Sequence, residues 1–243
     1  IFFCIRCPFA VIRLSEKALL SILEEDEVAD STHVAKAKIA RRTTRQVKVG
    51  RILVGGDAPI SIQSMTKVDT EDVDAVVRQI DGLLEEGCEI VRLAVPTRNA
   101  AKALGKIRKR TDAPLVADVH FNYRLALASI DSGADKVRVN PGYLRKREQV
   151  TAVIRKAKAA GIPIRVGANS GSILHGTPGE NVHPSGIGEA MVERVVEYMR
   201  FFEEEDFGDV VISLKASDVV ETVKAYEMMA ERCDYPFHVG VTA

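Results

Sequence analysis

The chain has 243 residues, of which 46% are hydrophobic, and its 34 basic and 34 acidic residues give a formal net charge of zero. This length and composition can bury a substantial core and fit one large α/β domain. Balanced charge argues against a protein that coats nucleic acid or binds membranes through a polybasic surface. Any positive field is therefore expected to be local, inside a cleft.

Four cysteines are too few for a disulfide framework in a chain this long, which favours a reducing, cytoplasmic compartment. Cys4 and Cys7 have the two-residue spacing of metal and redox motifs, but no second pair follows them. No metal site is therefore predicted. Cys88 and Cys233 stand near predicted helix ends and are interpreted as packing residues.

Residues 1–40 are interpreted as a leader of uncertain origin. Their Phe-rich beginning is too short to span a bilayer, and the acidic run 24–27 is typical of a solvated helix face. The folded domain is expected over residues 41–243.

From Val47 to Gly56 the sequence VKVGRILVGG predicts a short β pair with glycines at its turns. Beyond it, short β-rich runs alternate with helical patterns. Strands are predicted at 61–66, 90–97, 115–121, 137–142, 164–172, 211–217 and 238–242. Helices are predicted at 70–87, 98–110, 122–133, 145–160, 186–205 and 217–232.

Helices between nearly continuous hydrophobic strands predict a parallel sheet, and the repeat length favours a (β/α)₈ barrel of the TIM type. In such barrels the ligand-binding residues lie at the carboxyl ends of the strands, where polar residues recur here. A doubly wound open sheet is the alternative, but it does not require ligand-type residues at seven strand ends. Seven strands instead of eight predict an incomplete barrel, a fragment that lacks the eighth strand and any domain after it.

Four cations come from four different predicted strands and are expected to converge at the barrel mouth: Arg92, Arg138, Arg165 and Lys215. Clustered cations repel each other unless an anion neutralises them. Phosphate oxygens suit the planar fork of Arg and the point charge of Lys, so a diphosphate could engage all four. The structural alternative pairs each Arg with a carboxylate such as Asp118.

Other polar residues are expected at the same mouth. Asp118 and His120 share one face of a strand and could relay a proton, although two ligands are too few for a metal. Polar contacts are expected from the turn and strand-end residues Asn140, Asn169, Ser213 and Ser217, and His238 could line the mouth as well. His175 and His183 fall in a Gly/Pro-rich loop and are interpreted as solvent-exposed. No Walker loop or Gly-rich dinucleotide motif is present.

Seven stretches in this order resemble the 4-hydroxy-3-methylbut-2-enyl diphosphate synthase family. They are APISIQSMT, IVRLAVPT, PLVADVHFNYRLAL, VRVNPG, IPIRVGANSGS, SLKASDV and HVGVT, and the resemblance spans about residues 41–243.

The resemblance implies a (β/α)₈ barrel joined to a C-terminal domain that holds a four-iron four-sulfur cluster on three cysteines and a glutamate. It implies reductive opening of 2-C-methyl-D-erythritol 2,4-cyclodiphosphate, in the non-mevalonate isoprenoid pathway, with electrons from reduced flavodoxin or ferredoxin. It also implies a homodimer in which the partner's cluster domain closes over the barrel.

Carried over by motif, Arg92, Arg138, Arg165 and Lys215 would hold the diphosphate. Asn140, Asn169, Ser213 and Ser217 would add polar contacts, and Asp118 and His120 would be the catalytic residues. The cysteines of this chain do not match the family's cluster ligands, so the chain is expected to bind substrate without turning it over. The alternatives are another phosphate-binding barrel related to dihydropteroate synthase, and an inactive truncated domain.

Overall fold

The computed structural model describes residues 41–174 and 186–240. The predicted leader, Cys4, Cys7, His175 and His183 lie outside the described residues. All the elements below belong to one compact unit of the chain.

The predicted β pair is confirmed as an antiparallel hairpin of β1 (Gln46–Val49) and β2 (Ile52–Gly55). Val49 pairs with Ile52, so only two residues separate the strands. Gly50 has a φ of 55°, a left-handed conformation that glycine adopts without steric cost.

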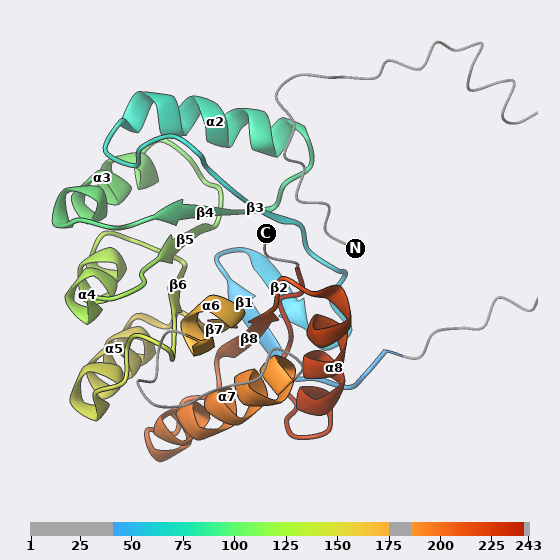
Figure 1. Cartoon of the computed structure of the whole chain (residues 1–243). Helices are drawn as coiled ribbons and strands as arrows, with labels where there is room; N and C mark the ends of the chain where they lie inside the picture. Colours follow the sequence, from blue (N-terminus) through green and yellow to red (C-terminus); the bar gives the residue numbers. More distant parts are fainter. Residues whose placement is uncertain (1–40, 175–185, 241–243) are drawn as a thin grey trace, which may run out of the picture. The chain divides into compact units, whose positions relative to one another are not determined.

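A second sheet contains six parallel strands in chain order. They are β3 (Gln63–Met65), β4 (Ile90–Ala94), β5 (Leu115–Asp118), β6 (Lys136–Val139), β7 (Ile164–Asn169) and β8 (Val210–Lys215). Each strand lies beside the next one in the sequence, the pattern that successive β–α units produce in a TIM barrel. The parallel α/β architecture is therefore confirmed (Figure 1).

The six predicted helices are also confirmed, most of them a few residues shorter than predicted. They are α2 (Val73–Glu85), α3 (Arg98–Arg108), α4 (Tyr123–Asp131), α5 (Arg147–Ala160), α7 (Ile187–Glu204) and α8 (Val219–Ala230). One short helix, α6 (Ser170–Leu174), was not predicted. It occupies the end of the run read as a strand to residue 172, because the side chain of Asn169 accepts a hydrogen bond from Ser172 N and turns the chain there.

The seventh predicted strand is reduced to its beginning in the described part of the chain. Phe237 forms a single parallel bridge with Ile212 of β8, and His238 N donates to Ile212 O at 2.8 Å. Residues 241–243, at the end of the predicted run, lie outside the described residues. Among the described strands the sheet therefore has six members and one bridged segment, an incomplete barrel.

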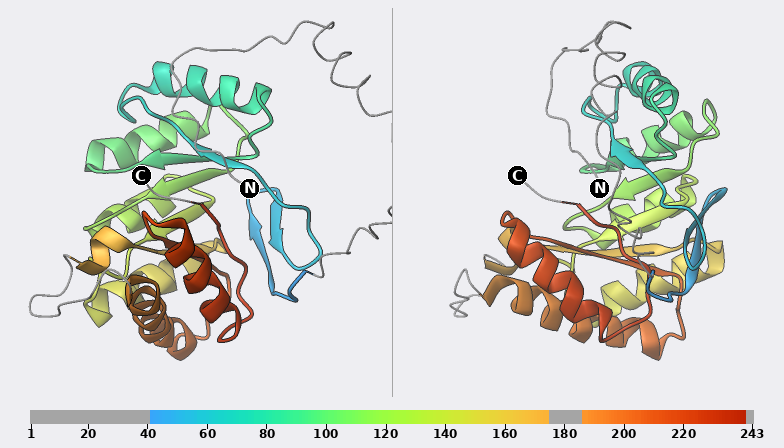
Figure 2. Two further views of the ribbon diagram at one scale, coloured as in Figure 1. Left: turned by 45° about the vertical axis from the view of Figure 1, so that its right-hand side comes forward. Right: turned by 90° about the vertical axis from the view of Figure 1, so that its right-hand side faces the viewer.

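The strands are apolar on one face and polar on the other. Outward residues such as Val91, Leu115 and Val166 belong to the core that packs against the helices. Residues at the alternate positions of the strands, including Arg92, Lys136 and Arg165, face the interior of the curled sheet. This alternation follows the two-residue period of a strand. Figures 1 and 2 show the strands in the middle and the helices around them.

The hairpin packs against the amino ends of the strands and supplies the apolar floor of the interior. Val49 forms a small separate core with Ile90 and Val116, which begin β4 and β5. Arg51 Nη1 also donates to Asp112 O, just before β5, at 3.0 Å. The hairpin thus covers the amino end of the interior.

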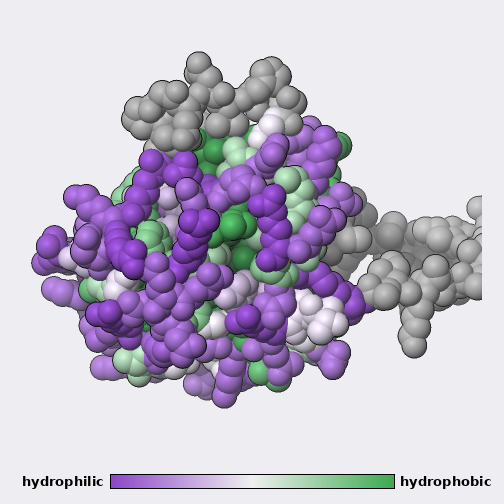
Figure 3. All heavy atoms as spheres, turned by 90° about the horizontal axis from the view of Figure 1, so that it is seen from below, coloured by the Kyte–Doolittle hydropathy of each residue, from purple (hydrophilic) through white to green (hydrophobic). Residues whose placement is uncertain are grey.

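Most residues on the face in Figure 3 are hydrophilic, with hydrophobic residues between them. Ion pairs lie on the outer side of the helices, such as Arg155 of α5 with Glu205 at 2.7 Å and Arg232 with Glu193 of α7 at 2.5 Å. Exposed pairs of this kind contribute little to stability.

Candidate functional site

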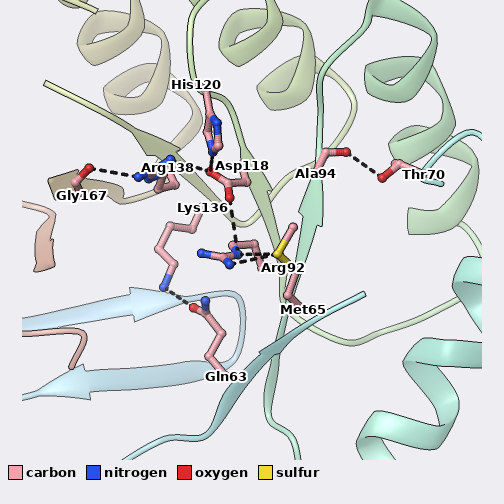
Figure 4. Close-up of polar contacts among 10 residues, drawn as sticks. All are labelled: Gln63, Met65, Thr70, Arg92, Ala94, Asp118, His120, Lys136, Arg138 and Gly167. Carbon is pink, nitrogen blue, oxygen red and sulfur yellow. Dashed lines mark hydrogen bonds and ion pairs between the residues drawn. The ribbon is translucent and has the colours of Figure 1, made fainter. Parts of the chain in front are cut away.

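The carboxylate of Asp118, the last residue of β5, is the centre of the polar interior. Its Oδ1 lies 3.1 Å from Arg138 Nη1 and 3.2 Å from His120 Nε2, and its Oδ2 lies 3.5 Å from Arg92 Nε (Figure 4). Asp118 is 7% exposed. The structure therefore brings together four predicted site residues from three neighbouring strand ends.

Asp118 stays ionised in this position. Burial acts to raise the pKa of its carboxyl, but the hydrogen bond from His120 and the charges of Arg138, Arg92 and Arg165 outweigh burial. The net effect holds the pKa of Asp118 far below its usual range. Asp118 therefore acts as a fixed negative charge that orients its neighbours.

Arg138 is held from two sides. Nη1 donates to Asp118, and Nη2 donates to Gly167 O on β7 at 3.1 Å. Its Nε has no hydrogen-bond partner among the described residues, although the side chain is buried. Burial is the main cause that lowers the pKa of Arg138, and the charge of Asp118 opposes it.

Arg165 lies deeper than the sequence suggested. It is the second of the six residues of β7, not a strand-end residue, and it is only 2% exposed. The predicted position at the carboxyl end is therefore wrong for Arg165, since β7 begins at Ile164. Its Nε and Nη1 have no partner in the described part of the chain. Burial, followed by the charges of Arg92 and Arg138, lowers the pKa of Arg165 to about 9.

Arg92 of β4 is the least firmly paired of these arginines. Besides the distant contact with Asp118, its Nε and Nη2 lie 3.2 and 2.9 Å from the sulfur of Met65. A thioether sulfur is a weak hydrogen-bond acceptor, so the guanidinium of Arg92 can still donate strong hydrogen bonds to a better acceptor.

Two interior residues, Lys136 and Gln63, were missed by the sequence analysis. Lys136, the first residue of β6, is 1% exposed, and its Nζ donates to Gln63 Oε1 of β3 at 3.2 Å. The run was read as starting at Val137, so Lys136 was placed outside the strand. Its spacing of two residues from Arg138 was the signal that places both on one face.

The turn residues serve the backbone as well as the site. Asn140 Oδ1 accepts from Gly142 N at 2.9 Å, and its buried Nδ2 has no partner in the described residues. Asn169 Oδ1 is occupied by Ser172 N at 2.7 Å. Fixing these amides by their oxygens leaves their nitrogens as potential donors to a ligand.

Ser213 and Lys215 lie on the same face of β8, opposite Gly167 and Asn169 of β7. Ser213 is buried, whereas Ser217, beyond the end of β8, is exposed. A side chain on Gly240 would come within 2.7 Å of Lys215 Nζ, so the segment after the bridge passes close to this lysine. The strand register places Ser213 and Lys215 on the inner face of the sheet, the face that also carries Arg165.

Two histidines differ in their surroundings. The His120 side chain is 48% exposed, at the rim beside the exposed ring of Phe121, which packs on Tyr143. His238 lies among cations: burial, then the charges of Arg165 and Lys215, hold its pKa well below the ordinary value. The proximity of His238 to the interior cations agrees with the sequence analysis.

The described residues do not fit an iron–sulfur cluster, which requires several cysteine thiolates. Cys88 is buried with its thiol directed to Ile90 O at 3.2 Å, and Cys233 Sγ lies 3.4 Å from Met229 O. No group of three His, Cys, Asp or Glu residues in the described ranges could hold a metal ion. Both cysteines are packing residues here, as predicted.

The family model described as the GcpE TIM-barrel domain matches residues 44–243. The chain belongs to this family. Curated relatives named 4-hydroxy-3-methylbut-2-en-1-yl diphosphate synthase (flavodoxin) are similar to it over 204 residues. Those of Anoxybacillus flavithermus and Symbiobacterium thermophilum are each 50% identical, over 84% of this chain and 56% and 55% of their own length. The GcpE barrel chain therefore spans about half the length of the curated relatives that it matches.

Solved structures support the barrel fold of the GcpE domain. A dihydropteroate synthetase is similar with a TM-score of 0.57 and 10% identity, covering 79% of this chain and 77% of that one. The type I 3-dehydroquinate dehydratase of Clostridium difficile has a TM-score of 0.58 and 14% identity, covering 83% and 82%. At such identities the likeness shows the fold alone.

The interior of the GcpE barrel carries an excess of positive charge. On β4–β8 the inward positions carry one carboxylate, Asp118, against five cations: Arg92, Lys136, Arg138, Arg165 and Lys215.

None of the described helices is long and apolar enough to cross a membrane.

Proposed function

We propose that this chain is the substrate-binding barrel of a 4-hydroxy-3-methylbut-2-en-1-yl diphosphate synthase. One observation supports this most strongly. Among the residues that the structure describes, six buried side-chain polar atoms lack a hydrogen-bond partner, and four of them are nitrogens of Arg138, Asn140 and Arg165. Buried polar groups nearly always have partners, so donors gathered on one face point to an acceptor-rich ligand.

A diphosphate group matches this set of donors. Its oxygens can accept hydrogen bonds from the unpartnered nitrogens of Arg138 and Arg165. Its negative charge can also neutralise the positive charges of the interior that Asp118 alone does not balance. Lys215 would supply a point charge from β8, and Arg92 could exchange its weak thioether contact for a phosphate oxygen. Asn140, Asn169, Ser213 and Ser217 would add neutral contacts around the same group.

The proposed substrate is 2-C-methyl-D-erythritol 2,4-cyclodiphosphate, which the family resemblance implies. Its cyclic diphosphate would enter the cationic interior, and its carbon skeleton would remain toward the mouth. His120 lies at that rim and is the residue placed to move a proton. Asp118 would orient His120 and fix the guanidinium of Arg138 in a position to contact the ligand.

The remaining requirements of the reaction are proposed from the family. The curated relatives carry flavodoxin in their names, and reduced flavodoxin or ferredoxin would be the electron donor. A four-iron four-sulfur cluster would supply the electrons at the substrate. The described residues include no set of cysteines that could hold it. Homodimerisation and a cytoplasmic location remain predictions.

The family match favours this function over a dihydropteroate synthase activity, for which there is only the shared barrel at 10% identity. An inactive domain would retain the same donors, so the proposal is tested first by binding.

Isothermal titration of the chain with the cyclic diphosphate tests the proposal. We expect saturable binding, weakened roughly ten- to a hundred-fold in Arg165→Met, because a hydrogen bond to a charged group contributes about 1.5–3 kcal/mol. Arg155→Met, which removes an exposed arginine from the outer face of α5, is the matched control and should bind normally. Absence of binding, or equal affinity in Arg165→Met, would refute the diphosphate assignment.

A further inference from the structure

Lys136 spans the interior of the barrel. Its backbone begins β6, yet its ammonium group reaches Gln63 on β3, and two strands, β4 and β5, separate β6 from β3 in the sheet. The side chain must therefore cross the enclosed space beneath the Asp118 cluster, as Figure 4 shows. At 1% exposure it is among the most buried large side chains of the described chain.

The side chains that face Lys136 are cationic or neutral, apart from Asp118, whose carboxylate is already engaged by other residues. Arg165 faces it from β7 and Arg92 from β4, and both act on it electrostatically. After burial and the charge of Arg165, the charges of Lys215 and Lys136 also lower the pKa of His238, which follows β8. Gln63 on β3 is neutral, and the carboxylate of Asp118 on β5 is engaged by His120, Arg138 and Arg92. No carboxylate in the described interior therefore neutralises a protonated Lys136.

A buried ammonium group among cations loses its proton easily. Burial, and then the charges of Arg165 and Arg92, lower the pKa of Lys136 to about 7. In slightly alkaline solution the free chain therefore holds Lys136 largely as a neutral amine. A neutral amine still donates to Gln63 while it relieves the repulsion among the arginines.

We propose that Lys136 takes up one proton from solvent when an anion enters the interior, and so becomes an additional cation of the binding site. This inference rests on the proposed function, since it requires that the interior binds a diphosphate. The step forms one N–H bond on Nζ, with the proton supplied by solvent, and involves no electron transfer. The incoming negative charge provides the driving force because it favours the charged form of a nearby amine.

A purely structural role for Lys136 makes a different prediction. If Lys136 only ties β6 to β3 through Gln63, its replacement alters stability but leaves the proton balance of binding unchanged. The number of protons taken up on binding therefore separates the two roles.

The experiment is isothermal titration of the chain with inorganic pyrophosphate at pH 6 and pH 8, in buffers of different ionisation enthalpy. The dependence of the heat on the buffer gives the number of protons taken up. Pyrophosphate also titrates in this range, so wild type is compared with Lys136→Met under identical conditions. With a pKa of about 7, we expect wild type to take up about 0.9 proton more than the variant at pH 8 and about 0.1 more at pH 6.

A second variant keeps the lysine. Gln63→Glu places a carboxylate at the position of the amide that now contacts Nζ at 3.2 Å, which should keep Lys136 protonated in the free chain. It should lose the extra proton uptake at pH 8 just as Lys136→Met does, and it tests the proposal even if Lys136→Met does not fold. Thermal unfolding followed by circular dichroism monitors both variants.

Equal proton uptake in wild type and in either folded variant at pH 8 would overturn the role of Lys136 while leaving diphosphate binding intact. If wild type binds no pyrophosphate at either pH, the proposed function itself fails and the inference falls with it. These two results are distinguishable in a single set of titrations.

Discussion

The guanidinium group of Arg138 occupies the space that a side chain at Gly167 would need. A Cβ at position 167 would lie 2.9 Å from Arg138 Nε, and Nη2 donates to the carbonyl of the same glycine at 3.1 Å. The absent side chain on β7 thus allows Arg138 of β6 to lie flat against the neighbouring strand while Nη1 reaches Asp118. Gly167 is required for space here, not for an unusual backbone conformation.

Gly167→Ala should therefore displace Arg138. We expect a loss of about 1–3 kcal/mol in the free energy of unfolding, as for other overpacked interiors, and roughly ten-fold weaker binding of pyrophosphate. Urea unfolding and isothermal titration measure the two effects. Gly82→Ala in α2 is the control, because nothing lies within 4 Å of its added Cβ, and it should be neutral or slightly stabilising. Normal pyrophosphate binding by Gly167→Ala would contradict the proposed role of Arg138.

Arg165→Met should stabilise the chain while it weakens binding. The guanidinium is buried with two nitrogens unpartnered among the described residues, and its main electrostatic neighbours are cations. Replacing such a group with an apolar side chain of similar length should raise the free energy of unfolding by about 1–4 kcal/mol. A denaturant titration without ligand measures this gain. A destabilised variant would instead indicate that Arg165 holds the barrel together.

The stability of the free chain should depend on Lys136 between about pH 7 and pH 10. Its folded pKa of about 7 lies below its value in the unfolded chain, about 10.4, so the unfolded state binds more protons in this range. The Lys136 contribution to stability therefore rises with pH, by up to about 5 kcal/mol in total. The difference between wild type and Lys136→Met, measured by urea unfolding at pH 7 and pH 9.5, isolates this contribution. A difference that does not change with pH would show that Lys136 titrates normally in the folded chain.

Asp118→Asn should destabilise the chain, because it leaves the charges of Arg138 and Arg92 without their carboxylate. Breaking a buried ion pair by removing one partner costs about 3–5 kcal/mol. Since the folded pKa of Asp118 is depressed, its contribution is present above the unfolded pKa of about 3.9 and is lost as the pH falls below that value. The stability gap between wild type and Asp118→Asn at pH 7 should therefore narrow below about pH 4. Unfolding curves at pH 7, 4 and 3 measure the gap, and a gap that persists unchanged at pH 3 would refute the electrostatic explanation.

The sequence by itself determined the order of the elements and the face on which the charges lie. Alternation in runs such as Val137, Arg138 and Val139 separates an apolar outer face from a polar inner one, because successive side chains of a strand point in opposite directions. Helical periodicity gave the six helices to within a few residues, and the motifs around Asp118 and Arg138 gave the family.

Only the tertiary structure decided how deep each charge lies and which partner it has. Arg165 was predicted at a strand end but lies near the beginning of β7, and Lys136 was passed over although it reaches across to Gln63. Gly167 carried no signal of its role, because the space it leaves is used by a residue 29 positions away. Depth, pairing and pKa depend on the curvature of the sheet and on residues distant in sequence, which local periodicity does not encode.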